Sequence, residues 1–265
     1  DIKAPEIPEY DFEETDVEIV HSEFSPPEGE LKKYGNTIYD KKGGVIFSFL
    51  KNFGGFIVEG GNKIYINQMV EPGTAGFRFF IFGTAMALLL HQRGIITLHA
   101  GAVSIDDRVI GFVGNSGAGK STTVASLCSK GYPFVSDDIL ALDIIKDRVI
   151  SYPSNPYIKL DQKSVKMATE EDYNSLKKTH PSSRKKVMEV KSIQEKRNLP
   201  LEEIYVLEKD KHESENTKVS KIEGRASFME MIKNSYSLRI LGRSAISSQH
   251  FEKLSQVSKI VKTKS

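Results

Sequence analysis

The chain has little cysteine and no recognisable targeting segment. Cys128 is its one cysteine in 265 residues, so an intrachain disulfide is excluded and a reducing compartment is indicated. No signal peptide is visible, and we expect a cytoplasmic protein. Because Cys128 falls within an expected helix, we interpret it as a small buried residue rather than a reactive thiol.

Charge of one sign and long apolar runs are also lacking. The 37 Lys and Arg residues nearly balance the 35 Asp and Glu residues, with a net charge of +2, so any polyanion-binding feature must be local. The apolar run at residues 79–90 is shorter than the roughly 20 residues that span a bilayer. We therefore expect a buried helix over 75–93, ended by Gly94, and neither a membrane nor a nucleic acid as partner.

The most informative stretch that is present is a glycine-rich loop at residues 114–121. Its pattern is G-x-x-x-x-G-K-S, the phosphate-binding P-loop, with Gly114, Asn115, Ser116, Gly117, Ala118, Gly119, Lys120 and Ser121. Residues 109–113 predict a buried parallel strand before it, and residues 121–130 predict a helix that ends at Gly131. The loop and the helix start, including Thr122, then bind a nucleoside triphosphate; Lys120 reaches the β- and γ-phosphates and Ser121 holds Mg²⁺.

Two further groups flank this loop. Asp137 and Asp138 follow an apolar run at 132–136, where one carboxylate can bind Mg²⁺ and the other can accept the proton of an attacking hydroxyl. Their roles are interchangeable at this stage, and one of them could instead cap a turn. His99 lies one hairpin before the loop, with the turn at 106–107, and is either a core histidine or a neighbour of the γ-phosphate.

The first 70 residues are expected to form a subdomain of their own. Residues 1–30 are acidic and interrupted by proline, which predicts an irregular arm with one strand at 17–20. Short β-prone runs between residues 31 and 70, separated by glycine-containing turns, predict an antiparallel meander. Packing, dimerisation and substrate docking all stay open as its role. Residues 71–265 then form the catalytic domain.

The later part of the chain carries a polar, basic segment at 161–200. It is either a solvated loop or a lid that brings a cation to the phosphates, with Arg184 and Lys186 as the candidates. Beyond it, periodicity predicts a strand at 201–208, a helix at 226–235, an amphipathic helix at 246–261 and a frayed tail at 262–265. On the last helix we expect one apolar face, formed by Phe251, Leu254, Val257 and Ile260.

Three of these segments together resemble the catalytic domain of bacterial HPr kinase/phosphorylase. They are residues 98–103 with the histidine, the P-loop, and residues 131–138 with the two acids. A looser pattern that includes Ile158-Lys159-Leu160 and residues 200–207 looks like the HPr-kinase-like branch of lasso-peptide biosynthesis, which phosphorylates a serine of the precursor peptide. The resemblance implies an α/β fold, with a P-loop core of the HPr kinase/PEP carboxykinase-like type and an N-terminal antiparallel β-rich subdomain.

The resemblance also implies roles for the site residues. Lys120 and Ser121 bind ATP and Mg²⁺, Asp137 takes the proton of the acceptor serine, Asp138 assists with the metal, and His99 supports the transferring group. The partner is then a peptide substrate, and relatives of this kind often assemble as homo-oligomers through the catalytic domain.

The chain departs from HPr kinase/phosphorylase in one respect. The second signature of that enzyme, E-x-R-G-x-G, is absent, which favours an acceptor other than HPr. An HPr-type protein kinase, a kinase of a small hydroxyl substrate and a slow ATPase switch remain as alternatives. The lack of an Asn-Lys-x-Asp motif disfavours a GTPase.

Overall fold

The computed structural model describes most of the chain in two compact units. The described residues are 16–24, 37–40, 45–50, 54–68, 81–178, 183–193, 198–208, 218–241 and 247–265. One unit comprises Asp1–Ile95 with Ser237–Ile246, and the other Ile96–Tyr236 with Ser247–Ser265. The division therefore falls between Ile95 and Ile96, and not at residue 70 as the sequence had led us to expect.

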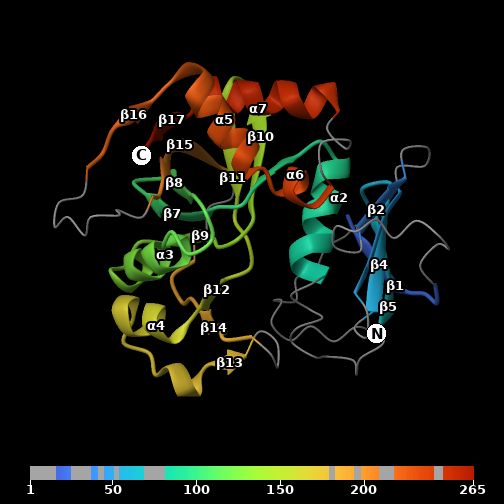
Figure 1. The fold of residues 1–265 in the computed structure, drawn as a ribbon, viewed down its shortest axis with the longest axis horizontal. Helices are drawn as coiled ribbons and strands as arrows, with labels where there is room; N and C mark the ends of the chain where they lie inside the picture. Colours follow the sequence, from blue (N-terminus) through green and yellow to red (C-terminus); the bar gives the residue numbers. More distant parts are fainter. Residues whose placement is uncertain are drawn as a thin grey trace. The chain divides into compact units, whose positions relative to one another are not determined.

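The first unit is a sheet with a helix packed on it (Figure 1). Its strands run in the order β1-β5-β4-β3-β2, with the bounds Glu18–His21, Lys63–Gln68, Gly54–Glu59, Val45–Leu50 and Thr37–Asp40. Strands β2 to β5 pair antiparallel, as the meander predicts, and β1 pairs parallel with β5. A π-helical turn, η1 (Ile81–Ala85), leads into α2 (Met86–Gln92).

Helix α2 explains why the division lies after residue 95. Its Leu88 and Leu89 share one buried cluster with Phe56 of β4, so the helix buries its apolar face on the sheet of the first unit. Gln92 donates from Nε2 to the Val58 carbonyl, at 3.0 Å. The expected helix is thus described over 81–92, whereas residues 75–80 lie outside the described residues. Within the described residues, no helix combines the length and apolarity that a membrane crossing requires.

A mixed sheet runs through the second unit. Its strands follow the order β6-β10-β11-β15-β8-β7-β9, with the bounds Ile96–Leu98, Leu140–Ile145, Arg148–Tyr152, Leu199–Val206, Arg108–Val113, Gly101–Ile105 and Phe134–Ser136. Strand β8, which precedes the P-loop, pairs parallel with β15 and antiparallel with β7. The chain is therefore an α/β protein, as predicted, and the P-loop strand is buried in the sheet.

The C-terminal tail is a strand, and the expectation of fraying was wrong. Strand β17 (Lys262–Lys264) pairs parallel with β15 and antiparallel with β16 (Lys221–Ile222). Thr263 is buried, and its hydroxyl lies 2.8 Å from that of Ser227. Backbone pairing on a central strand outweighs the polar composition of these residues, because a strand needs only one buried face.

Helices lie on both sides of this sheet. Figure 1 shows α5 (Gly224–Asn234) and α7 (Ser248–Ile260) on one side, and α3 (Lys120–Ser129) and α4 (Gln162–Ala168) on the other. On α7, Leu254 and Val257 are buried, whereas Phe251 and Ile260 are substantially exposed. The prediction of one apolar face is therefore correct for two of its four residues. Phe251 packs edge-on against Phe228, with ring centroids 4.9 Å apart.

The described part of the basic segment at 161–200 contains regular secondary structure. It contains α4, the short helix η2 (Tyr173–Ser175), and strands β13 (Lys177–Lys178) and β14 (Lys186–Glu189). Strand β14 pairs with β13 and with β12 (Tyr157–Leu160) in a separate small sheet. Ile158 and Leu160 of β12 are buried in the cluster that also holds Val124 of α3, which ties this small sheet to the P-loop helix.

Candidate functional site

The glycine-rich loop at residues 114–119 joins a buried strand to a helix, as the sequence predicts. Strand β8 ends at Val113 and α3 begins at Lys120. Gly114 and Gly119 have φ angles of 141° and 105°, a region that side chains with a Cβ disfavour. A Cβ on Gly114 would also lie 2.5 Å from the Leu207 carbonyl oxygen, so the turn requires glycine. Gly119, the residue before α3, provides no capping side chain, and the start of such a helix is a favourable place for a phosphate.

Lys120 folds back over this loop. Its side chain is buried, and Nζ donates to the Gly114 carbonyl at 2.7 Å and to the Asn115 carbonyl at 3.4 Å. The tip of the loop, Asn115, Ser116 and Gly117, is exposed. The ammonium group is thus held beside an open cradle of backbone groups, where it can meet a polyphosphate.

Asn234, at the end of α5, anchors the start of the loop and was missed by sequence reasoning. Its Oδ1 accepts from the Gly114 N–H at 3.2 Å, and its carbonyl accepts from the His99 N–H at 2.7 Å. Its Nδ2 donates to the Glu230 carbonyl at 2.9 Å. One buried asparagine therefore fixes both the P-loop and the histidine segment, although 120 residues separate Asn234 from Gly114.

The two acids follow β9 in a tight turn. The Ser136 hydroxyl donates to the Ile139 carbonyl at 2.6 Å, and Asp138 adopts a φ of 81°. Aspartate tolerates this left-handed region better than most residues, but such conformations persist mainly where surrounding contacts enforce them. The turn directs the two carboxylates to different partners.

Asp137 lies against the P-loop helix. Its Oδ2 accepts from the backbone N–H of Lys159 at 3.1 Å, and the Ser121 hydroxyl is near enough to the carboxylate to influence its pKa. Burial raises the pKa of Asp137, and the nearby charge of Asp138 raises it further, although the Lys159 N–H and the Ser121 hydroxyl favour the ionised form. A carboxylate with a raised pKa is a better proton acceptor than an ordinary aspartate.

Each carboxylate oxygen of Asp138 contacts a nitrogen atom of another side chain. His99 Nδ1 lies 2.9 Å from Oδ1, and Lys159 Nζ lies 3.0 Å from Oδ2. Burial alone would raise the pKa of Asp138, but His99 and Lys159 outweigh it and hold that pKa well below its usual range. His99 Nδ1 also lies 3.1 Å from the Asp138 carbonyl. The structure therefore places His99 beside the acid pair, with its ring centroid 6.2 Å from that of Tyr236.

Lys159 is a site residue to which sequence reasoning assigned no role. Burial lowers its pKa, but the negative charges of Asp138 and Asp137 outweigh burial and raise it. The signal was the strand alternation, because Ile158 and Leu160 are buried in the core and their neighbour must face the other way. The contact with Asp138 could not be predicted from local pattern, because 21 residues separate the two side chains in the sequence.

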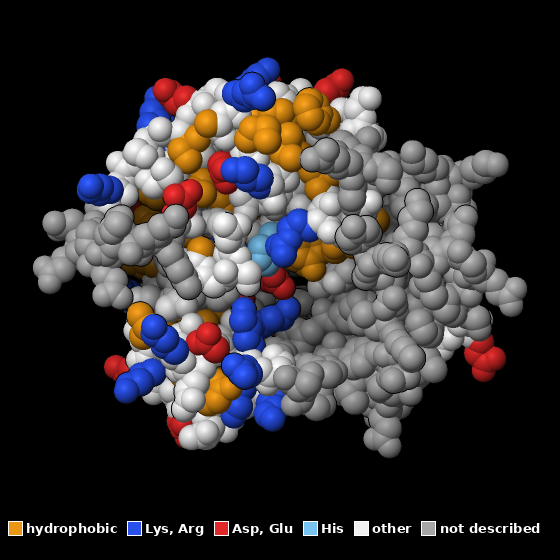
Figure 2. Space-filling view, in the orientation of Figure 1, with side chains coloured by type: hydrophobic (Ala, Val, Ile, Leu, Met, Phe, Trp, Pro, Cys, Tyr) orange, Lys and Arg blue, Asp and Glu red, His pale blue; other side chains and the backbone are white. Residues whose placement is uncertain are grey.

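The other predicted site residues lie apart from this cluster. Thr122 donates from its hydroxyl to Ser164 of α4 at 2.9 Å. Lys186 donates to the Tyr173 and Asn174 carbonyls and lies 4.5 Å above the Tyr173 ring, and the Arg184 carbonyl accepts from the Tyr173 hydroxyl. Figure 2 shows basic side chains gathered over α4, β13 and β14. The recorded contacts of Arg184 and Lys186 lie within this segment, and their phosphate-binding role stays a prediction.

The donor set of the cluster fits Mg²⁺. Ser121, Asp137 and Asp138 offer oxygen atoms only, which are the ligands that Mg²⁺ prefers. Among the described residues, no group of three or more His, Cys, Asp or Glu side chains forms a metal cage. Mg²⁺ is commonly bound by one or two carboxylates together with substrate phosphates.

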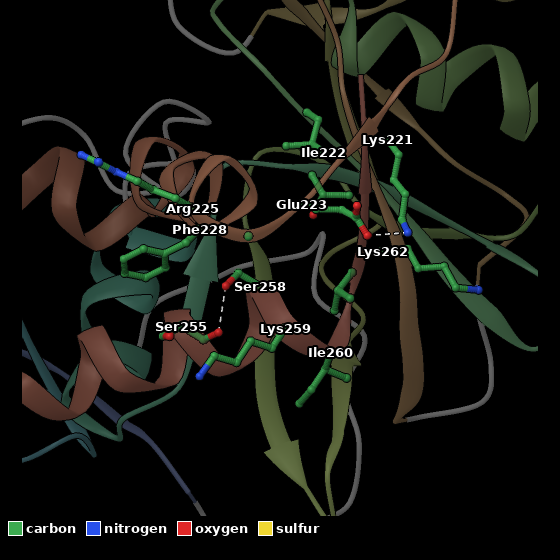
Figure 3. A pocket seen from close by; sticks show the side chains of 13 residues that line it. Lys221, Ile222, Glu223, Arg225, Phe228, Ser255, Ser258, Lys259, Ile260 and Lys262 are labelled. Carbon is green, nitrogen blue, oxygen red and sulfur yellow. Dashed lines mark hydrogen bonds and ion pairs between the residues drawn. The ribbon is translucent and has the colours of Figure 1, made fainter.

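A surface cavity elsewhere in the second unit offers a contrast. It has a volume of about 570 Å³ and lies at the start of α5, between the last turn of α7 and strands β16 and β17. Figure 3 shows that Arg225, Lys259 and Lys262 point away from one another there, and that Lys221 pairs with Glu223. The cations do not converge, and the predicted site residues do not line it. We therefore assign the site to the P-loop cluster.

Comparisons with known proteins give a likeness among solved structures alone. No protein-family model matches the chain, and no curated protein matches it. Among solved structures, the chain is similar to the Hpr(Ser) kinase/phosphatase from Coxiella burnetii, at 16% sequence identity and a TM-score of 0.33, over 48% of this chain and 76% of that one. A likeness at this level carries no inference about activity, so the site is interpreted from its own geometry.

Proposed function

We propose that the protein is an ATP- and Mg²⁺-dependent kinase that transfers the γ-phosphate to a serine hydroxyl of a peptide. One observation carries this proposal, namely that Asp137 reaches the P-loop Ser121 while its neighbour Asp138 is held by His99 and Lys159. Phosphoryl transfer depends mainly on positioning and charge neutralisation. A phosphate-binding loop beside two carboxylates whose pKa values are shifted in opposite directions meets both requirements.

Each residue then has a task. Backbone N–H groups of the loop other than those of Gly114 and Ala118, which have partners within the protein, bind and orient the phosphates together with the ammonium of Lys120. Asp137 accepts the proton of the acceptor hydroxyl, which a raised pKa favours. When bound at Ser121 and Asp138, Mg²⁺ would supply positive charge to the phosphate oxygens. His99 holds Asp138 in its left-handed turn.

The acceptor is the finer part of the proposal. The resemblance of residues 98–103, 114–121 and 131–138 to HPr kinase-like enzymes, together with the missing second signature, favours a peptide-tailoring relative over an HPr kinase. We therefore propose a lasso-peptide precursor as the substrate, with its serine as the acceptor. A homo-oligomer that assembles through the catalytic domain is part of the same proposal.

The test is mass spectrometry of candidate precursor peptides after incubation with the protein, ATP and Mg²⁺. A gain of one phosphate on serine, and none on the serine-to-alanine peptide, supports the proposal. Phosphorylation of HPr instead would place the chain with the protein kinases. Release of ADP without modification of any acceptor would contradict the kinase proposal and identify an ATPase switch.

A further inference from the structure

A single lysine contacts both acids of the site. Lys159 donates its backbone N–H to Asp137 Oδ2 at 3.1 Å and its ammonium to Asp138 Oδ2 at 3.0 Å. Its side chain is 29% exposed and that of Asp138 is 31% exposed, so the ion pair lies at the wall of the site and not in the core. A group in this position can contact both the protein and a bound ligand.

The backbone of Lys159 is held by strand pairing, whereas its ammonium is held by an ion pair. Strand β12 pairs with β14 through its whole length, and the side chains on either side of Lys159 are anchored in the core. The ammonium, by contrast, ends a chain of four methylene groups and is held by carboxylate charge. Lysine side chains with this geometry can exchange one anionic partner for another at little steric cost.

Lys159 and a divalent cation would compete for the carboxylate of Asp138. In the described structure its two oxygens contact His99 and Lys159. A divalent cation on the same carboxylate would lie close to the lysine ammonium, and like charges at such a distance repel strongly in a partly buried site. The lysine must then weaken the binding of the cation, or move.

We propose that Lys159 is a further phosphate ligand of the site, which neutralises Asp138 while the site is free of nucleotide and turns to the transferring phosphoryl group when a divalent cation binds Asp138. This inference rests on the proposed kinase function. It makes metal binding dependent on nucleotide, because the ammonium leaves the carboxylate most readily when phosphate oxygens can receive it.

The transfer step balances without any further reactant. The bond between the γ-phosphorus and the bridging oxygen breaks, and ADP leaves with that electron pair. The acceptor oxygen forms the new bond to phosphorus, and its proton passes to Asp137. Lys159 exchanges no proton in this step and contributes charge alone, on the side of the phosphoryl group that faces β12.

Binding measurements on Lys159→Met test the inference without needing an acceptor. Methionine keeps the apolar length of the side chain and removes the charge. In the absence of nucleotide, we expect Mn²⁺ binding, followed by electron paramagnetic resonance, to tighten by about 10-fold, because the variant lacks the positive charge that repels the cation and competes for Asp138. We expect the affinity for a non-hydrolysable ATP analogue with Mg²⁺ to fall by about 10-fold, which corresponds to the loss of one charge-assisted hydrogen bond.

Controls separate this role from a structural one. Lys163→Met removes an exposed lysine of α4 and should change neither affinity. Lys159→Arg keeps the charge and should leave Mn²⁺ binding near that of the wild type, which a misfolded site would not. The melting temperature of each variant establishes that the variants are folded, and Lys159→Gln replaces Lys159→Met if the latter is not.

Two results would overturn the inference. If Mn²⁺ binding without nucleotide stays the same or weakens in the folded Lys159 variants, the lysine builds the metal site and does not compete for it. If the affinity for the ATP analogue does not fall, Lys159 is no phosphate ligand. Both readouts are independent of the acceptor, so a protein that binds nucleotide and metal as described but phosphorylates no peptide would refute the proposed function alone.

Discussion

The two ends of helix α5 carry similar chemistry and differ in how it is arranged. At its C-terminal end, Asn234 contacts the P-loop and the histidine segment. At its N-terminal end, about 16 Å away along the helix, the cavity is lined by Lys221, Arg225, Lys259 and Lys262. Both ends combine cations, hydroxyl groups and open space. Only at the first do the charged groups share partners, as His99 and Lys159 share Asp138.

The contrast shows that convergence of charged groups marks the site better than the size of a cavity. At the P-loop end, burial raises the pKa of Asp137, whereas His99 and Lys159 lower the pKa of Asp138, so the two neighbouring carboxylates differ in their affinity for a proton. At the cavity end, Lys221 satisfies Glu223 locally. Variants at the two ends should therefore differ in kind, with activity lost at one and stability changed at the other.

The largest expected effect is that of Lys120→Ala. Removing the ammonium beside the loop should lower the rate of phosphoryl transfer by about 10³–10⁵-fold, the range for a single cation on the transferring group. Steady-state ADP release measures the effect. Lys130→Ala, at the exposed other end of the same helix, is the matched control, and a Lys120 variant as active as that control would refute the P-loop assignment.

Asp137→Asn should come next. The amide keeps the size of the side chain but cannot accept the proton, so turnover should fall by about 10²–10⁴-fold. Binding of a fluorescent ATP analogue should be retained. Asp147→Asn, on an exposed hairpin turn, controls for the substitution itself. Normal turnover in the Asp137 variant would mean that another group is the base.

Asn234→Ala tests the anchor at the same end of α5. The Gly114 N–H would lose its buried acceptor, which costs about 1–3 kcal/mol, and the loop would be less well positioned. We expect a fall in melting temperature together with a rise in the KM for ATP, by about 10-fold for each 1.4 kcal/mol of lost binding. Lys233→Ala, exposed on the same turn, should change neither quantity. A stable Asn234 variant with an unchanged KM for ATP would show that Asn234 does not position the loop.

The cavity end should give the smallest effects. Arg225→Ala should leave transfer unchanged, because its side chain points away from the other cations. Nearby, Lys264 lies 2.9 Å from Glu203 and lowers the pKa of that carboxyl, with a smaller opposing effect of burial and further help from the Tyr205 hydroxyl. Glu203→Gln should therefore lower the melting temperature slightly at neutral pH, and leave transfer intact.

The pH dependence of that last effect has a defined sign. The folded-state pKa of Glu203 lies below its unfolded value of about 4.3. Its stabilising contribution is therefore complete above pH 4.3 and is lost as the pH falls through the lower, folded-state value. Urea unfolding at pH 7 and at pH 3 measures the difference between wild type and Glu203→Gln. That difference should shrink at the lower pH, whereas Glu202→Gln should show no such trend; a difference that grows at low pH would contradict the ion pair.

Local pattern predicted much of the fold. The strand–loop–helix around residues 109–130, the meander and the helices α5 and α7 are where periodicity and glycine placed them. The misses have a common cause. Residues 262–264 form β17 because they pair with β15, a strand far away in the sequence. Helix α2 belongs to the first unit because it buries apolar side chains against Phe56 and its neighbours. Neither fact is visible in the tail or the helix alone.

By itself, the sequence determined that a glycine-rich loop stands between a buried strand and a helix, because glycine spacing and apolar runs act within about 30 residues. It also placed a histidine and two acids nearby. Only the tertiary structure decided that Lys159 contacts both acids and that Asn234 anchors Gly114, because these pairs are 21 and 120 residues apart. Their contacts depend on how strands β12 and β8 and helix α5 pack, and that packing is a property of the whole unit.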